Sequence, residues 1–319
     1  MDAGQRDAFF SVSSVHRRAV GGINVLGLVK GKVVADFDYL TAFSRNIGWV
    51  TREEQARLRN ARVAIAGLGG VGGSHALTLA RLGVGAFAAA DPDTFGLENF
   101  NRQAGASMAS IGYGKLAVIR EQLGSINPEV QVDGIEGAVA EDNVDEFLAG
   151  ADLYVDGLDF FALEARRLVF AACAERGIPA ITAAPLGMGV AFLAFLPGHM
   201  TFEEYFRMEG QSREEQLLRF LVGLSPAMLQ TSYLVEPSTV RLKDQKGPST
   251  AMGCELCAGV AATEALKILL GRGPVRAAPK GLHFDAYLQR YAKTWRPGGN
   301  RNPVQRFALA IARRRFRSA

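Results

Sequence analysis

The chain has 319 residues and a formal net charge of +4, with 48% apolar and 21% charged residues. A length of this order allows about two domains, or a single large doubly wound sheet with appendages. With this composition a substantial core can be buried, which excludes an intrinsically disordered chain and leaves a globular protein.

Apolar runs alternate with helical patterns along the chain, a rhythm that predicts a parallel sheet. We expect strand 62–66, helix 70–82, strand 84–90, helix 112–125, strand 130–135, helix 141–148, strand 151–156, helix 161–176 and strand 178–182. The expected fold class is α/β, a doubly wound (Rossmann-like), mostly parallel sheet with helices on both faces. From 198 to 247 the pattern loosens, although residues 212–223 keep a helical spacing of leucines. An apolar helix over residues 254–270, closed by Gly271 as a C-cap, and a C-terminal extension of the sheet complete the prediction.

The run 62–73 is the most informative segment of the chain. Its apolar strand leads into a glycine-rich turn that contains Gly67, Gly69, Gly70 and Gly72. Such glycines let the backbone approach phosphate at the N-terminus of the next helix. A second apolar strand ends at Asp91, about 20 residues farther on, where dinucleotide folds bind a ribose hydroxyl. These two features alone favour NAD.

More polar and cationic side chains follow closely after Asp91. They are Asn99, Asn101, Arg102, Gln103 and Lys115. These side chains supply more positive charge and more hydrogen bonds than the pyrophosphate of NAD needs. A triphosphate needs charge and hydrogen bonds of this number. The segment therefore predicts an ATP site rather than a site for hydride transfer.

Together with Asp91-Pro-Asp93 and Val155-Asp-Gly-Leu-Asp159, these motifs resemble those of the ThiF/MoeB superfamily, the adenylating enzymes related to ubiquitin-activating enzymes. The resemblance covers roughly residues 40–275, and its five short elements follow the order and spacing of the bacterial members. It implies three parts of the chain: an N-terminal arm with helices over 1–60, an adenylation domain over 61–275 with its crossover and substrate region at 184–252, and a C-terminal strand and basic tail over 276–319.

The resemblance also implies a role for each matching residue. Gly70 lets the loop lie against the phosphates, and Asp91 holds the ribose. Asn99, Arg102 and Lys115 grip the triphosphate. The whole implied ATP site consists of Gly67, Gly69, Gly70, Gly72, Asp91, Asp93, Asn99, Arg102, Gln103 and Lys115.

Asp159 matches the family aspartate that positions magnesium, a cation that usually takes one or two carboxylates together with phosphate oxygens. Where the family has an Asp-Asn pair, this chain has Asp159-Phe160, so one polar neighbour is missing. The implied catalytic residues are Arg45, Arg102, Lys115 and Asp159.

Arg45 enters this set through the segment 39–46, which resembles the family segment that delivers an arginine into the partner subunit's ATP site. An arginine supplied in trans neutralises developing phosphate charge and accelerates phosphate chemistry. This role implies a homodimer. The alternative is that Arg45 is a solvated residue at a helix end.

Cys254 and Cys257 form a CxxC pair, but structural zinc needs four ligands, normally from two such pairs. Zinc-bearing relatives place their pairs elsewhere in the chain, so we expect structural thiols at a helix N-terminus and no zinc. The alternatives are a redox pair and a mixed cysteine–histidine site with His199 or His283. Cys173 is expected in the core, and residues 183–252 contain no cysteine for a thioester relay.

His75 lies in the first turn of the helix that follows the glycines. A general base needs a partner that orients it, and no acidic residue is adjacent. We therefore expect His75 to pack or cap rather than to catalyse.

Three cysteines are too few for a disulfide framework, and no basic-then-apolar leader opens the sequence, so we expect a reducing, cytoplasmic location. The longest apolar run, residues 178–197, is interrupted by Pro179, Pro185, Gly187 and Gly189. A spanning helix needs about 20 residues without such breaks. We therefore expect buried strands that flank a loop, and no membrane span.

Much of the positive charge lies in the tail, at residues 313–317. One interpretation is a frayed, solvated end. The other is a basic helix, preceded by the apolar residues 307–311, that contacts RNA, an anionic membrane surface or an acidic partner.

The resemblance implies an ATP- and magnesium-dependent adenylyltransferase that activates a carboxylate, often the C-terminus of a small protein or peptide, as an acyl-adenylate. A first alternative is a tRNA threonylcarbamoyladenosine dehydratase-like enzyme. The motif Asn101-Arg-Gln103 and the lack of zinc pairs also resemble such enzymes. In that case the basic tail would bind RNA. A second is a non-catalytic nucleotide-binding or scaffold protein, in which Phe160 marks the loss of turnover.

Overall fold

The computed structural model describes residues 36–241 and 244–317. Contacts join residues 38–319 into one compact unit, so the segment just before the glycine-rich strand and the segment after residue 276 belong to the same body. Residues 1–35 of the N-terminal arm expected over 1–60 lie outside the described residues.

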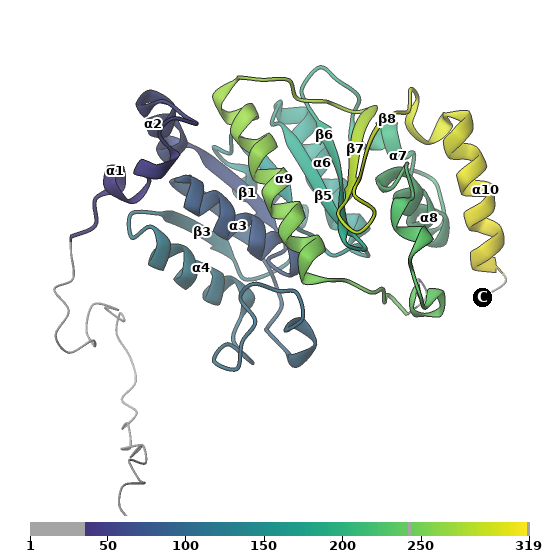
Figure 1. The fold of residues 1–319 in the computed structure, drawn as a ribbon, viewed down its shortest axis with the longest axis horizontal. Helices are drawn as coiled ribbons and strands as arrows, with labels where there is room; N and C mark the ends of the chain where they lie inside the picture. Colours follow the sequence, from purple (N-terminus) through teal and green to yellow (C-terminus); the bar gives the residue numbers. More distant parts are fainter. Residues whose placement is uncertain (1–35, 242–243, 318–319) are drawn as a thin grey trace, which may run out of the picture. The chain divides into compact units, whose positions relative to one another are not determined.

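Eight strands form one sheet in the order β3-β2-β1-β4-β5-β6-β7-β8 (Figure 1). Their bounds are β1 Arg62–Ala66, β2 Ala86–Ala90, β3 Gln131–Ile135, β4 Leu153–Asp156, β5 Ala180–Leu186, β6 Gly189–Phe195, β7 Lys280–Asp285 and β8 Arg290–Trp295. The pairs from β3 to β5 are parallel, and the pairs from β5 to β8 are antiparallel. The doubly wound sheet with a C-terminal extension is thereby confirmed.

Helices cover both faces of this sheet. They are α1 Tyr39–Ala42, α2 Arg52–Asn60, α3 Gly70–Leu82, α4 Lys115–Ile126, α5 Val144–Leu148, α6 Leu163–Arg176, α7 Phe202–Phe206, α8 Arg213–Leu224, α9 Ala251–Leu270 and α10 Pro303–Arg317. Side chains of a strand alternate between the faces, and β1 follows this rule. Val63 and Ile65 join the apolar cluster under α3, α4 and α9, whereas Ala64 and Ala66 join the cluster under α5 to α8.

Aromatic packing anchors the segment whose sequence pattern loosens. Phe202 of α7 stacks on Phe170 of α6, with ring centroids 4.5 Å apart and planes at 24°. Phe195 at the end of β6 contacts the same two rings. Aromatic side chains bury large areas in such clusters, so α7 and α8 are held on the sheet despite the weak local pattern.

Helices α4, α5, α6 and α9 begin at other residues than predicted, and the starts of α4 and α9 have a clear local reason. Helix α4 begins at Lys115 rather than at 112, because Gly112 has a left-handed φ of 79° that a helix does not tolerate. Helix α9 begins at Ala251 rather than at 254, because the Thr250 side chain accepts a hydrogen bond from the Gly253 N–H and caps the helix. Cys254 therefore lies inside the first turns of α9.

The C-terminal segment holds two strands and a helix rather than one strand and a tail. The basic residues belong to α10, which docks on α8 through Leu309 and Ala312 against Leu218 and Val222. Arg313 donates to both carboxylate oxygens of Glu215 in α8, at 2.6 and 2.9 Å. The interpretation of residues 313–317 as a frayed end is wrong for this reason.

Replacing Leu309 with alanine should loosen this docking. Leu309 is 2% exposed, and large-to-small core changes cost about 2–5 kcal/mol. Urea denaturation of the Leu309→Ala variant should show a loss of that order in the free energy of unfolding. Val304→Ala on the same helix, at a side chain that is 55% exposed, is the control and should change it little.

Candidate nucleotide site

The glycine-rich turn lies where three strands end side by side. Ala66 of β1 pairs with Ala90 of β2 and with Asp156 of β4. Gly67 leaves β1 with a φ of 82°, and a Cβ there would collide with the Gly157 carbonyl; a Cβ on Gly72 would collide with the carbonyl of Gly67. Glycine is thus required for the turn to pass between the ends of β1 and β4.

The same turn opens helix α3 at Gly70. Gly69 is the N-cap, and within the described residues no side chain caps this helix. The first N–H groups of an α-helix have no partner inside the helix, and together with its dipole they attract anions. The N-terminus of α3 therefore has the chemistry of a phosphate site.

Asp91 ties the end of β2 to this turn. Its carboxylate accepts hydrogen bonds from the N–H of Leu68 at 2.6 Å and of Asp93 at 2.8 Å. Burial raises the pKa of Asp91, and the two backbone hydrogen bonds oppose that rise. The predicted ribose ligand thus also holds the turn in place.

Lys115, at the start of α4, is a buried cation with one acidic partner. Its Nζ lies 2.8 Å from Oδ2 of Asp93, and its side chain is 7% exposed while that of Asp93 is 64% exposed. The positive charge of Lys115, which is expected to bind a triphosphate, is therefore paired with the solvent-exposed carboxylate of Asp93. An anion that approaches Lys115 competes with Asp93.

Gln103 and Arg102 border the glycines from the loop that follows β2. The Gln103 amide lies 3.5 Å from the position of a Cβ on Gly69, and the Arg102 Nε lies 3.7 Å from that of a Cβ on Gly70. Oε1 of Gln103 is buried and has no hydrogen-bond partner among the described residues. A buried acceptor without a donor is costly, so this oxygen is free to accept a hydrogen bond from a bound molecule.

Asn99 has a different environment from its neighbours in the motif. Its Oδ1 accepts from the N–H of Gly96 at 2.9 Å, and the residue is 7% exposed. The side chain shapes the loop that carries Arg102. Its predicted contact with the triphosphate stays a prediction.

Asp159 is exposed and follows β4 at the same edge of the sheet. Its Oδ1 accepts from the Phe161 N–H at 2.9 Å. No group of three or more His, Cys, Asp or Glu side chains in residues 36–241 and 244–317 is arranged to hold a metal ion. Magnesium would thus depend on Asp159 together with phosphate oxygens, a ligand set that this cation accepts.

Arg166 of α6 fixes the loop that presents Asp159, and the sequence analysis missed it. Its Nε lies 2.8 Å from Oδ2 of Asp156, and the two side chains are 3% and 1% exposed. Its other nitrogens donate to the carbonyls of Leu158 and Asp159. The sequence of α6 does not indicate this ion pair. A buried arginine can be recognised only when the fold shows which carboxylate lies next to it.

Phe160, which stands where the family has the Asn of its Asp-Asn pair, has a packing role. Its ring packs on Phe161 and on Phe220 of α8, with both centroids 5.1 Å away. The residue therefore docks α8 against the loop of Asp159.

Cys254 lies against the turn, with its Sγ 3.3 Å from the position of a Cβ on Gly70. Burial raises the pKa of this thiol, and the Ser249 hydroxyl and Arg102 oppose the rise. Burial also raises the pKa of Cys257. Thiols held in the protonated form disfavour a reactive redox pair, and the mixed site with His199 or His283 is not formed among the described residues.

Arg45 lies far from the turn of its own chain. It is exposed in the short helix Ser44–Asn46, and the next residue, Asn46, donates to the carbonyl of Leu82 at the C-terminal end of α3. Since α3 has 13 residues, that end is on the order of 18 Å from Gly70. Arg45 therefore does not reach the phosphate site of its own subunit.

These features define a protein with a Rossmann-type fold whose candidate anion site lies at the switch between β1 and β4. The sequence model of the ThiF family matches residues 43–305, and the chain belongs to the ThiF family. The expected resemblance is thereby confirmed.

Curated relatives match over part of the chain. The vegetative HesA protein of Trichormus variabilis is 35% identical over 147 residues, which cover 46% of this chain and 55% of the relative. A tRNA threonylcarbamoyladenosine dehydratase of Bacillus subtilis is 33% identical over 45% and 56%. A ThiS adenylyltransferase of Escherichia coli is 32% identical over 46% and 58%. The chain thus spans about half the length of the curated relatives it matches.

Two groups of solved structures share the fold. PaaA superposes with a TM-score of 0.61 at 17% identity, over 85% of this chain and 78% of its own. Escherichia coli MccB with ATP superposes with a TM-score of 0.58 at 20% identity, over 79% and 70%. At these identities the likeness establishes the fold alone.

Among the described residues, no helix is both long and apolar enough to span a membrane.

His75 should make the protein acid-sensitive. It is fully buried and both ring nitrogens lack partners among the described residues, so burial lowers its pKa from 6.5 to about 3. Below pH 6.5 the unfolded chain takes up a proton that the folded chain refuses, so stability falls with pH. Denaturant titrations at pH 7, 6, 5 and 4 should show a loss in the parent that exceeds that of His75→Leu, by about 1.4 kcal/mol per pH unit once the pH is below about 6. Equal slopes for the two proteins would contradict the burial of a neutral imidazole.

Proposed function

We propose that the chain is an ATP- and magnesium-dependent adenylyltransferase that activates a carboxylate. The observation that carries the proposal is the orphaned Oε1 of Gln103 beside the uncapped start of α3. An anion site next to a buried acceptor fits a ligand with both phosphates and donors. ATP meets this requirement, since its ribose and adenine supply O–H and N–H groups next to its phosphates.

In the proposed reaction a carboxylate oxygen attacks the α-phosphorus of ATP. The bond to the β-phosphate breaks, pyrophosphate leaves and an acyl-adenylate forms. Arg102 and Lys115 neutralise charge that develops on the phosphates, and a carboxylate nucleophile needs no protein base. Asp159 would hold magnesium, which when bound would supply Lewis-acid stabilisation of the negative charge on the phosphates.

The carboxylate is proposed to be the end of a small protein or peptide. Relatives with this kind of substrate in their names support it: the ThiS adenylyltransferase of Escherichia coli, a SAMP-activating enzyme E1 of Haloferax volcanii, and MccB solved with MccA. Residues 184–252 are the proposed specificity region.

A dehydratase acting on modified tRNA is the second candidate. Its support is the Bacillus subtilis dehydratase at nearly the same identity as the adenylyltransferase, together with the basic helix α10. The specific observation against it is that Arg313 in α10 is already paired with Glu215.

Exchange of labelled pyrophosphate into ATP tests the proposal. Exchange that depends on a peptide or small protein from the neighbouring reading frames supports carboxylate activation. ATP hydrolysis that depends on tRNA supports the dehydratase instead. Binding of ATP without either activity would contradict catalysis and support the nucleotide-binding scaffold.

Asp91→Ala and Lys115→Ala should separate two parts of ATP recognition. Asp91 is proposed to contact the ribose and Lys115 the phosphates, so the first variant should weaken binding of adenosine and ATP alike, and the second should weaken ATP alone. Loss of a contact to a charged group costs about 1.5–3 kcal/mol, or roughly 10- to 100-fold in affinity. Calorimetric titration measures both ligands. Parent-like affinities in both variants would remove the site assignment.

We also propose a homodimer in which Arg45 serves the partner's site. Arg45 is remote from its own turn, and its neighbours Leu40, Ile47 and Trp49 are exposed, Trp49 at 84%. Exposed apolar side chains that gather on one segment are typical of an interface. Under a two-fold axis each subunit would offer this segment to the other.

Mixing variants tests the trans contact. Arg45→Ala and Lys115→Ala should each be inactive, while a mixture after subunit exchange should regain activity because some heterodimers hold one intact site. Exchange is checked by light scattering and by differently tagged chains. A monomeric parent, or no recovery despite proven exchange, would remove the trans role of Arg45.

A further inference from the structure

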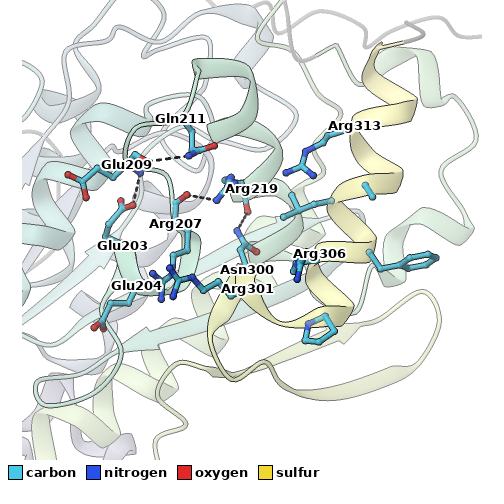
Figure 2. Close-up of a pocket in the computed structure, with 14 residues that line it drawn as sticks. Glu203, Glu204, Arg207, Glu209, Gln211, Arg219, Asn300, Arg301, Arg306 and Arg313 are labelled. Atoms are coloured by element: carbon cyan, nitrogen blue, oxygen red, sulfur yellow. Dashed lines mark hydrogen bonds between the residues drawn. The ribbon is translucent and has the colours of Figure 1, made fainter.

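A concave site lies between α8 and α10 (Figure 2), away from the glycine-rich turn. It is a groove of about 1040 Å³. Five arginines line it: Arg207, Arg219, Arg301, Arg306 and Arg313. None of them belongs to the nucleotide site or to its proposed chemistry.

Two of these arginines have a carboxylate partner. Arg219 and Arg313 both pair with Glu215, at 2.7 and 2.6 Å. The single carboxylate balances one of their two positive charges, and the ion pair of Arg313 joins α8 to α10. These two residues therefore help to build the groove and leave it with one positive charge.

The other three arginines make no ion pair among the described residues. Arg207 ends α7 in a left-handed conformation with φ of 59°, and its Nε is buried without a hydrogen-bond partner. Arg301 and Arg306 reach the groove from the start of the α10 region, and neither side chain has a hydrogen-bond partner in residues 36–241 and 244–317. Three unpaired guanidinium groups around one groove favour a carboxylate-bearing or phosphate-bearing ligand.

Hydrogen bonds position the wall that carries Arg301. Asn300, which is 4% exposed, donates to the carbonyls of Phe206 and Arg219 at 2.8 and 3.0 Å. Figure 2 shows this residue between the α8 wall and the α10 wall. The backbone next to Arg301 is thus positioned before a ligand arrives, which lowers part of the entropic cost of binding.

The remaining lining distinguishes between classes of anion. Glu204 and Glu209 also line the groove, and neither forms an ion pair with the described residues. A nucleic acid presents a phosphate at every step, and these carboxylates would repel it. A polypeptide can place acidic side chains at the arginines and neutral or basic ones at the glutamates.

Helix α10 adds an apolar contact beside the arginines. Phe307 lines the groove and is 69% exposed, and Val304 and Ile311 are 55% and 41% exposed. Positions three and four apart lie on one side of a helix, so these side chains form an exposed apolar stripe. An apolar side chain of a polypeptide could pack on this stripe while its acidic side chains contact the neighbouring arginines.

We propose that this groove between α8 and α10 docks an acidic polypeptide segment, with its carboxylates on Arg207, Arg301 and Arg306 and an apolar side chain on Phe307. The site does not depend on ATP or on the proposed adenylation.

Fluorescence anisotropy with a labelled ten-residue peptide of Glu, Asp and Leu tests the proposal on the full chain. The parent should bind it, and the Arg301→Glu/Arg306→Glu variant should bind at least about 10-fold more weakly, because each lost contact joins two charged groups. Arg52→Glu/Arg81→Glu, an equal change of charge at two exposed residues of α2 and α3, is the control and should bind like the parent. Thermal unfolding verifies that each variant is folded.

Phe307→Ser is the second variant, and it leaves the core intact because Phe307 is exposed. It should weaken the peptide several-fold without changing net charge. Parent protein that does not bind the peptide, or parent-like binding by both groove variants, would overturn the proposal. So would an RNA hairpin of equal net charge that displaces the peptide and loses its own affinity in the same variants, since the occupant would then be a nucleic acid.

Discussion

Close contact between three glycines determines the geometry of the candidate site. Gly67, Gly72 and Gly157 bring the ends of β1 and β4 and the start of α3 within backbone contact, and a Cβ on Gly67 or Gly72 would collide with a carbonyl. This contact fixes the position of the uncapped N-terminus of α3 relative to the ends of β1 and β4. Asp91 then fixes the turn from the side of β2 through the Leu68 N–H. The candidate nucleotide site is therefore built mainly of backbone, with the charged side chains placed around it.

Helix α9 connects this site with the N-terminal segment. Its first turns place Cys254 beside Gly70, while its last carbonyls, of Leu269 and Leu270, accept hydrogen bonds from Arg57 of α2. A helix of 20 residues is about 30 Å long. The segment with Arg45 and the phosphate site are thus at opposite ends of the same scaffold. This separation is the physical reason for placing Arg45 in a partner's site.

Elements with a strong local signal could be predicted from the sequence. Strand β1 and helix α3 have the expected bounds, since an apolar run followed by glycines permits few other structures. Helix α7 and the docking of α10 could not be predicted, because they depend on contacts between distant residues such as Phe170 with Phe202 and Arg313 with Glu215. Arg166 was missed for the same reason. In the site, the motif identified Gln103 as polar, but only the fold shows that its oxygen is buried and without a partner.

The most direct test of the central claim is the thermal shift that magnesium-ATP produces in the parent, in Gly70→Ala and in Gly124→Ala. A Cβ on Gly70 would enter the space beside Arg102 and Cys254, whereas a Cβ on Gly124 of α4 meets nothing within 4 Å. At about 100 times its Kd, a ligand stabilises the native state by about 2.7 kcal/mol. The account predicts a rise of about 5 °C in Tm for the parent and for Gly124→Ala, and almost none for Gly70→Ala. A parent that ATP does not stabilise, or an unchanged shift in Gly70→Ala, would contradict a phosphate site at the start of α3.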